Sequence, residues 1–236
     1  LFPYTTLFRS VQLSQRLKDV ATYVPKGAKL LDVGSDHAYL PIYLLEKGLI
    51  TSAIAGEVVK GPYESALANV SASGFQDKID VRLANGLAAF EPADEVTTIT
   101  ICGMGGRLIA DILDSGKDKL KGVDRLILQP NNREDDLRIW LMENGFEIIA
   151  ESIMTENGKY YEIMVAEAGH MSLSDKEVRF GPHLMKDQSQ VFQLKWQREI
   201  NKLEIALGFI PLVNQADRTA IEDKIQTIKE VLNHVS

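Results

Sequence analysis

The sequence predicts a doubly wound α/β fold, in which a mostly parallel seven-stranded sheet carries helices on both faces. Apolar runs of strand length alternate with helical segments from Leu13 to Gly145. This alternation indicates parallel strands joined by helical crossovers. Two β-rich runs then surround Asn157 and Gly158, a dipeptide that favours a tight hairpin turn. The sheet is therefore expected to end in an antiparallel hairpin over residues 146–168.

The successive elements follow from spacing and from their end residues. A first helix is predicted over residues 13–24, where apolar residues recur at helical spacing before Pro25. The parallel strands are expected at 29–34, 52–58, 79–86, 96–106 and 125–131. The helices that follow strands are expected at 37–48, 61–74, 107–116 and 133–145, each closing on a glycine.

Beyond His170 the pattern changes to long helices. Apolar residues recur in steps of four and three along two stripes, which are Trp196, Ile200, Leu203, Leu207 and Ile210, and Ile221, Ile225, Ile228, Leu232 and Val235. Such stripes predict an antiparallel helical hairpin with a coiled-coil seam. We therefore expect an α/β domain over 11–169 and an α-helical coiled-coil domain over 170–236. Because the stripes are of similar length and can cover each other, a monomer is expected.

The first ten residues, LFPYTTLFRS (1–10), do not resemble a designed protein segment. Their codons can spell a common sequencing-library adapter, so we expect an assembly artefact and exclude them from the fold. The alternative is a genuine N-terminal arm.

Composition excludes several classes of protein. Cys102 is the only cysteine, so an internal disulfide is impossible and a reducing cytoplasm is the expected compartment. No apolar run is long enough to predict a membrane span, and no metal site is expected. The net charge of −7 argues against a general nucleic-acid coat.

The loop after the first strand, GSDHAY (34–39), contains a single glycine. A nicotinamide-dinucleotide loop needs three glycines, and Asp36 would set negative charge beside a pyrophosphate. A nicotinamide oxidoreductase therefore ranks last. S-adenosylmethionine carries an ammonium and a sulfonium but no phosphate. Acidic side chains suit these cations, and helix-start N–H groups suit the carboxylate of that cofactor.

Polar side chains and glycines stand where the second, third and fourth strands are expected to end. Glu57 lies 23 residues beyond Gly34, where an acid can accept hydrogen bonds from ribose hydroxyls. Because carboxyl ends of parallel strands meet at one edge, the groups should converge there. The expected cofactor contacts are Asp32, Gly34, Ser35, Asp36, His37, Glu57, Val58, Asn85, Gly86, Cys102, Gly103 and Met104.

Each of these residues also has a structural interpretation. A glycine after a strand is usually a turn, Glu57 alone could be a solvated acid, and Cys102 an inert buried thiol. His37 could simply form a hydrogen bond at the helix start. Their occurrence in order along one edge favours the cofactor.

Several motifs together resemble one family. They are LSQRLKDVA (13–21), LLDVGSDHAYLP (30–41), GEV (56–58), ANGL (84–87), ICGMGG (101–106) and QPN (129–131). This set is similar to the bacterial TrmK family of tRNA (adenine-22-N1)-methyltransferases, from Val11 to the C-terminus. The resemblance implies a class I methyltransferase domain followed by a coiled-coil domain. It also implies that S-adenosylmethionine methylates N1 of an adenine in the D-arm of tRNA.

The resemblance leaves the catalytic residues open. Gln129 and Asn131 could hydrogen-bond the adenine edge, or could equally satisfy backbone groups at a turn around Pro130. No acid follows the fourth strand to accept from the adenine amino group. Asp36 or His37 could substitute. The candidate catalytic residues are therefore Asn131, Gln129 and His37.

Contacts with tRNA are expected from local clusters of positive charge, because phosphates respond to local charge. The candidates are Arg16 on the first helix and Lys195 and Arg198 on the helical hairpin, although charged helix faces are usually just solvated. Tyr160 or Tyr161 could stack on a base. Two alternatives stay open: a methyltransferase with another substrate, and a non-catalytic S-adenosylmethionine-binding module whose coiled coil does the work.

Overall fold

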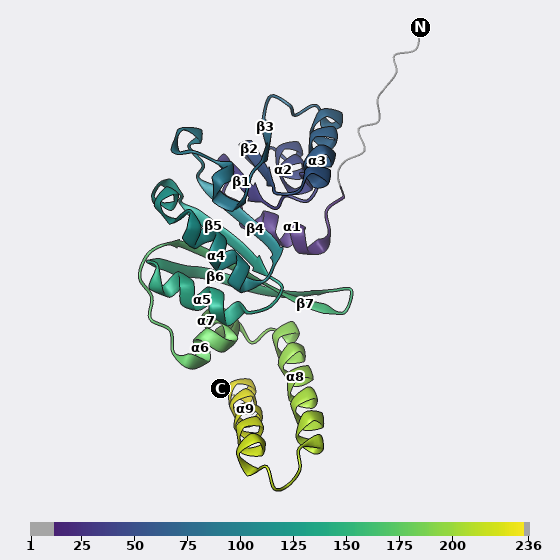
Figure 1. Cartoon of the computed structure of the whole chain (residues 1–236), viewed down its shortest axis with the longest axis vertical. Coiled ribbons are helices and arrows are strands. Elements are labelled where there is room, and N and C mark those ends of the chain that lie inside the picture. Colours follow the sequence, from purple (N-terminus) through teal and green to yellow (C-terminus); the bar gives the residue numbers. More distant parts are fainter. Residues whose placement is uncertain (1–11, 234–236) are drawn as a thin grey trace.

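A seven-stranded sheet forms the centre of the protein, as the sequence predicted, and its strand order is β3-β2-β1-β4-β5-β7-β6. The computed structural model describes residues 12–233, and the segment 1–10 lies outside them. The strands are β1 (Ala28–Val33), β2 (Ile50–Glu57), β3 (Ile79–Leu83), β4 (Thr98–Met104), β5 (Arg125–Pro130), β6 (Phe146–Glu156) and β7 (Lys159–Ala168). β1 to β5 pair in parallel, and β7 pairs antiparallel with both β5 and β6 (Figure 1).

Helices cover both faces of the sheet, which makes the fold doubly wound. α1 (Gln15–Thr22), α2 (Tyr39–Glu46) and α3 (Lys60–Ser73) pack on one face through a cluster that includes Val20, Leu40 and Val70. α4 (Gly106–Ser115) and α5 (Glu134–Glu143) pack on the other through Ile109 and Leu137. Short 3₁₀ turns lie at η1 (Gly86–Ala89), η2 (Pro92–Asp94) and η3 (Lys117–Gly122). Because both faces are buried, the central strands are almost wholly apolar.

The loop between β1 and α2 is tighter than the sequence predicted. α2 begins at Tyr39, two residues after its expected start at 37, because Asp36, His37 and Ala38 have φ values of 44°, 73° and 60°. A left-handed conformation costs a non-glycine residue roughly 1–2 kcal/mol. The side-chain amide of Asn69 donates to the carbonyl of His37 at 3.0 Å and helps to hold this turn. Strain is thereby concentrated at the carboxyl edge of the sheet.

The β6–β7 hairpin turns at Asn157 and Gly158, as expected. Their φ values of 52° and 73° are both positive, which a type I′ turn requires. Ile149 is an extra residue in β6, since Ile148 pairs with Ala166 and Ala150 pairs with Val165. Successive residues of β7 point to opposite faces of the sheet.

The C-terminal part is helical and projects from the sheet (Figure 1). It contains α6 (Asp175–Phe180), α7 (Pro182–Asp187), α8 (Gln190–Phe209) and α9 (Gln215–Asn233). The two long helices were predicted; α6 and α7 were not, because each is too short to show a helical stripe. Phe180, Trp196 and Ile228 belong to a third apolar cluster that joins these helices. The coiled-coil seam and the boundary at 169/170 stay predictions, and Val235 lies outside the described residues.

A buried arginine fastens these helices to the sheet. Arg138 on α5 donates from Nε to Glu151 at 2.8 Å and from a terminal nitrogen to Glu162 at 2.5 Å. Its side chain is 0% exposed, as is that of Glu151. The second oxygen of Glu151 accepts from the backbone N–H of His183 on α7, and Arg138 also donates to the carbonyl of Val178 on α6. One guanidinium therefore joins α5, β6, β7 and α6.

The network continues to α8 through Lys195, whose ammonium contacts Glu162 at 2.6 Å and Glu134 at 3.2 Å. Burial alone would raise the pKa of Glu162, but Arg138 and Lys195 outweigh it and lower that pKa below its usual value. A carboxyl with a lowered pKa stabilises the fold above its ordinary pKa. This contribution is lost as the pH falls through the lowered value.

We expect Arg138→Met to reduce the free energy of unfolding by about 3–5 kcal/mol, because it leaves the buried Glu151 carboxylate without a cation and Glu162 with Lys195 alone. Urea unfolding at pH 7 measures the loss. Arg125→Met is the matched control, since Arg125 pairs with Glu167 at 2.5 Å but both side chains are partly exposed. The control should lose about 1 kcal/mol or less. Equal losses in the two variants would contradict a special role for Arg138.

Candidate active site

A cavity of about 330 Å³ opens at the carboxyl ends of β1, β4 and β5. In α/β sheets this edge is where ligands bind. The lining residues are Arg16, Leu17, Asp32, Gly34, Ser35, Asp36, Leu40, Cys102, Gly103, Met104, Asn131 and Tyr161. Most residues expected to contact a cofactor thus converge here, together with Arg16 from the predicted tRNA contacts. Leu17 and Leu40 were not foreseen, because apolar helix residues give no indication of which ones border a cavity.

Asp32 at the end of β1 is the most deeply placed acid of this cavity. Its two oxygens accept hydrogen bonds from the hydroxyls of Ser35 and Thr100, each at 2.6 Å. Burial raises the pKa of Asp32 to about 6, and nearby Glu57 and Asp36 add to the rise, while the two hydroxyls oppose it. The carboxyl is therefore poised to change charge just below neutral pH.

Glu57, at the end of β2, presents an unsatisfied acceptor. The residue is 6% exposed, and its Oε1 has no hydrogen-bond partner within residues 12–233. Burial raises the pKa of Glu57, and the negative charge of Asp36 adds to the rise, while the backbone N–H of Asp36 opposes it by a hydrogen bond. A buried carboxylate oxygen without a donor is costly, so its presence indicates a hydrogen-bonding ligand.

The turn at Gly34 completes this side of the cavity. Gly34 has φ 64°, and a Cβ there would lie 2.4 Å from the terminal methyl carbon of Met104. The N–H groups of Gly34 and Ser35 both donate to the carbonyl of Gly56, at 2.9 and 3.2 Å. A bare backbone, buried acids and an orphaned acceptor fit the ribose and the ammonium of S-adenosylmethionine, although individual contacts with that cofactor stay predictions.

Gln129 lies near the end of β5 and Asn131 directly follows the strand, but their side-chain amides are engaged within the protein. Gln129 is 0% exposed; its Oε1 accepts from Arg16 and from the N–H of Gly103, the latter at 3.0 Å. Its Nε2 donates to the carbonyl of Pro130 at 2.8 Å. The side chain of Asn131 donates to the carbonyl of Gly103 at 2.7 Å. This favours the structural interpretation for Gln129, whereas Asn131 still borders the cavity.

Arg16 links α1 to the opposite wall. Besides its bond to Gln129, its guanidinium lies over the ring of Tyr161, 5.4 Å from the ring centre. The sequence indicated both residues separately, as a cation and as an aromatic. It could not show that they meet, because they are far apart in the chain.

The remaining expected contacts, Glu57 among them, are not part of the lining of this cavity. The ring of His37 stacks on Tyr39, with centroids 5.4 Å apart. Val58 and Asn85 are exposed beyond β2 and β3, and Gly86 is buried at the start of η1. Cys102, by contrast, belongs to the lining, and burial raises the pKa of its thiol above the usual range, which favours the inert interpretation of this cysteine.

Lys195 and Arg198 occupy different surroundings on α8. Lys195 is mostly buried and paired with Glu162 and Glu134, so its charge is already compensated. Arg198 is exposed and donates to the carbonyl of Gly158 at 3.1 Å. The structural pairing of Lys195 was not foreseen, since a lysine on a helix face is ordinarily solvated.

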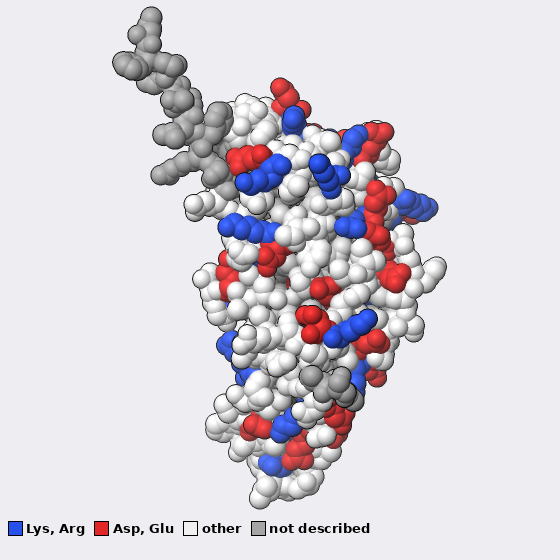
Figure 2. All heavy atoms as spheres, turned by 180° about the vertical axis from the view of Figure 1, so that it is seen from behind, with Lys and Arg blue, Asp and Glu red and all other residues white. Residues whose placement is uncertain are grey.

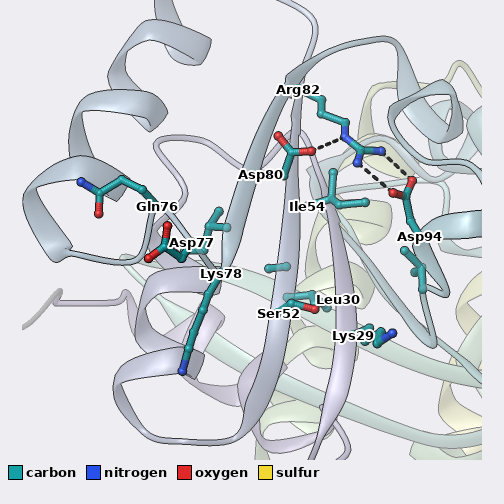
Figure 3. A pocket seen from close by; sticks show the side chains of 13 residues that line it. Lys29, Leu30, Ser52, Ile54, Gln76, Asp77, Lys78, Asp80, Arg82 and Asp94 are labelled. Atoms are coloured by element: carbon teal, nitrogen blue, oxygen red, sulfur yellow. Dashed lines mark hydrogen bonds and ion pairs between the residues drawn. The ribbon is translucent and has the colours of Figure 1, made fainter.

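A second hollow, shown in Figure 3, lies near the amino ends of β1, β2 and β3. Its charged groups neutralise one another: Arg82 binds Asp94 through two nitrogens and Asp80 through a third. Arg82 holds the pKa of Asp94 at about 2. This cluster fastens η2 to β3, and it offers no buried group in need of a partner.

Two features are absent from the described residues 12–233. No group of three or more histidine, cysteine, aspartate or glutamate side chains is placed to hold a metal ion. No helix in this range combines the length and apolar character needed to cross a membrane.

Comparisons with known proteins agree with this geometry. Residues 30–230 match the model of TrmK, described as tRNA (adenine(22)-N(1))-methyltransferase. The protein of that name from Bacillus subtilis (strain 168) is 40% identical over 235 residues, which cover 95% of this chain and 98% of that protein.

Solved structures extend the likeness. A Streptococcus pneumoniae protein has a TM-score of 0.93 at 65% identity, and covers 94% of this chain and 100% of its own. Its complex with S-adenosyl-L-methionine gives 0.89 at 63%, with the same coverage. M. capricolum TrmK, bound to S-adenosyl-homocysteine, gives 0.83 at 28%, and covers 95% of this chain and 99% of its own. The chain therefore belongs to the TrmK family of tRNA (adenine(22)-N(1))-methyltransferases.

Proposed function

We propose that the protein transfers the methyl group of S-adenosylmethionine to N1 of adenine 22 in the D-arm of tRNA. The observation that carries the proposal is the acidic cavity at the carboxyl edge of the sheet, with the unpartnered Glu57 oxygen beside it, in a chain that matches the family over residues 30–230.

The cofactor side of the cavity is built from acids. When bound, S-adenosylmethionine supplies an electrophilic methyl group. Asp32 and Asp36 contribute negative charge for its ammonium, and Glu57 offers its free oxygen to the ribose hydroxyls. The bare backbone at Gly34 admits the ligand close to β1. The chain thus binds and orients, and it need not supply a nucleophile.

The base side of the cavity has to admit an adenine and align its N1. Unprotonated N1 already carries a lone pair, so no strong base is required, and catalysis rests on alignment. The base must first leave its stack or its tertiary pairing. Asn131 and the ring of Tyr161 border the space available to it. We assign Arg16 and Gln129 to positioning, because their mutual hydrogen bond fixes α1 against the end of β5.

The electrostatics of tRNA binding are local. Figure 2 shows basic and acidic side chains interleaved over the displayed face, in keeping with the net charge of −7. Phosphate contacts depend on nearby cations, so a negative total does not prevent binding. We further propose that the protein acts as a monomer in the cytoplasm. The apolar stripes of α8 and α9 pack against each other within one chain, which supports a monomer. Its macromolecular partner is the tRNA substrate.

The substrate assignment is tested with protein lacking residues 1–10, labelled S-adenosylmethionine and unmodified tRNA transcripts. We expect label at N1 of adenine 22 and none in a transcript carrying guanine there, because guanine N1 bears a proton. Mapping the labelled nucleotide provides the measurement. Label elsewhere would assign another substrate atom. Intact cofactor binding without any label on nucleic acid would favour a different methyl acceptor or a non-catalytic module.

We expect Glu57→Gln to raise the Kd for S-adenosylmethionine about tenfold or more, because a charged hydrogen bond is worth roughly 1.5–3 kcal/mol. Calorimetric titration measures the Kd. The same variant should unfold at a higher temperature without cofactor, since it removes a desolvated charge. Glu64→Gln is the control, because Glu64 is exposed and pairs only at 3.6 Å with Lys60. Weakened binding in the control alone would refute the assignment.

Cofactor affinity should depend on pH through Asp32. Its pKa is raised to about 6, so its protonated form is favoured in the fold. The associated stability is present below the ordinary pKa and is lost as the pH rises through about 6. Binding of an ammonium needs the ionised carboxylate. The Kd should therefore fall about tenfold between pH 5 and pH 7. Asp32→Asn should bind weakly with no such slope; an unchanged slope would exclude Asp32 as its source.

A further inference from the structure

A small hollow lies where α8 meets the β6–β7 hairpin, outside the cavity described above. Its volume is about 170 Å³, and its lining includes Tyr160, Arg179, Lys195, Trp196, Arg198 and Lys202. One acid, Glu199, also borders it. Cations and aromatic rings are thus concentrated in a chain whose net charge is negative.

The cations of this hollow differ in how far they are already neutralised. Lys195 is held by two carboxylates, and Lys202 contacts Glu199 at 3.2 Å. Arg179 and Arg198 are exposed and are less occupied within residues 12–233. Arg179 has a single distant acid, Asp135 at 3.9 Å, and Arg198 donates to a backbone carbonyl. Two guanidinium groups therefore retain donors for an anion.

Trp196 adds a donor that has no acceptor. The residue is 3% exposed, and its indole Nε1 has no hydrogen-bond partner among the described residues. Its ring is fixed by Phe180, with centroids 4.4 Å apart, and Arg179 lies over it at 5.4 Å. A buried N–H without an acceptor is uncommon in folded proteins and indicates an absent ligand. An oxyanion would satisfy it.

The hollow lies across the sheet from the cofactor cavity but close to its rim. Tyr160 lines the hollow and Tyr161 lines the cavity, because neighbours on β7 face opposite sides. Lys195 at the hollow binds Glu134, the first residue of α5, which follows closely after Asn131. A chain of nucleotides that reaches the cavity over this rim would pass the hollow.

We propose that this hollow binds one nucleotide of tRNA outside the target adenine, with its phosphate held by Arg179 and Arg198 and the indole N–H. This inference rests on the proposed function and adds a second RNA contact to it. Arginine suits the task because its planar fork matches phosphate oxygens. The ring of Tyr160 offers a stacking surface for the attached base. Recognition is thus shared between an adenine pocket and a phosphate anchor.

The test uses a double variant that carries both Arg179→Gln and Arg198→Gln. It is compared with the control variant Lys121→Gln. Lys121 is exposed on η3, at the amino edge of the sheet, and its substitution removes one positive charge where the double variant removes two, so the effects are compared per charge. The double variant should bind tRNA about tenfold more weakly at 0.1 M salt. The slope of log Kd against log salt should fall by about 1 for each arginine removed. The Kd for S-adenosylmethionine should not change.

A second variant, Trp196→Phe, keeps an aromatic six-membered ring at this position and removes the indole N–H. We expect a Kd for tRNA raised about threefold, because the phosphate loses one donor, together with a lower melting temperature, because the smaller ring leaves part of a buried site empty. A tryptophan that only packs would leave tRNA binding unchanged.

The outcomes separate the two proposals. Suppose that the wild-type protein methylates adenine 22, but the double variant keeps the tRNA affinity and the salt slope of the wild type. This result overturns the proposed phosphate site in the hollow and leaves the proposed function standing. A wild-type protein that binds S-adenosylmethionine but neither binds nor methylates tRNA overturns the proposed function, and the hollow with it. Loss of affinity equal to that of Lys121→Gln also counts against the hollow.

Discussion

The architecture depends on one buried cation. Arg138 sits between Glu151 and Glu162 with no exposed surface, so its desolvation must be offset by close pairing. The same group constrains the backbone. A Cβ at Gly181, where φ is 87°, would lie 2.7 Å from the Arg138 guanidinium. Sheet, α5 and the C-terminal helices therefore meet at a point that tolerates neither an unpaired charge nor an added methyl group. Lys195 carries that arrangement onward to α8 and brings Trp196 beside the hairpin.

Much of the fold could be predicted because its elements have distinct periods. Buried parallel strands such as β1 are mostly apolar, the hairpin is marked by Asn157 and Gly158, and α8 is long enough to show its apolar stripe. α6 could not be found in this way, since six residues make less than two turns. The Arg138 network also escaped prediction. Charged residues are expected at the surface, and only the packing of distant segments reveals which ones are enclosed.

The sequence predicted at which edge of the sheet the active site lies, but not which contacts its side chains make. Strand ends located Asp32, Glu57 and Gly103, because parallel topology brings such positions together. The orientation of amides was not encoded locally. Whether the amide of Gln129 faces a ligand or the protein depends on Arg16 of α1, which is distant in the sequence but contacts Gln129 in the fold. The three left-handed residues 36–38 were hidden for a related reason: a non-glycine loop adopts them only when its surroundings compel it.

Side chains of β7 point alternately to the two faces of the sheet, and this limits which insertions and deletions the β6–β7 hairpin can accept. Tyr160 and Glu162 face one side of the sheet while Tyr161 faces the other, so a single inserted or deleted residue would exchange their sides. Glu162 would lose its contact with Arg138. Tyr160 would no longer line the hollow beside α8, and Tyr161 would no longer line the cavity at the carboxyl edge. The extra residue Ile149 in β6 already sets the phase between the two strands. Homologous proteins that keep this fold should therefore insert or delete residues of the hairpin in pairs, or compensate a single insertion with a bulge in the partner strand.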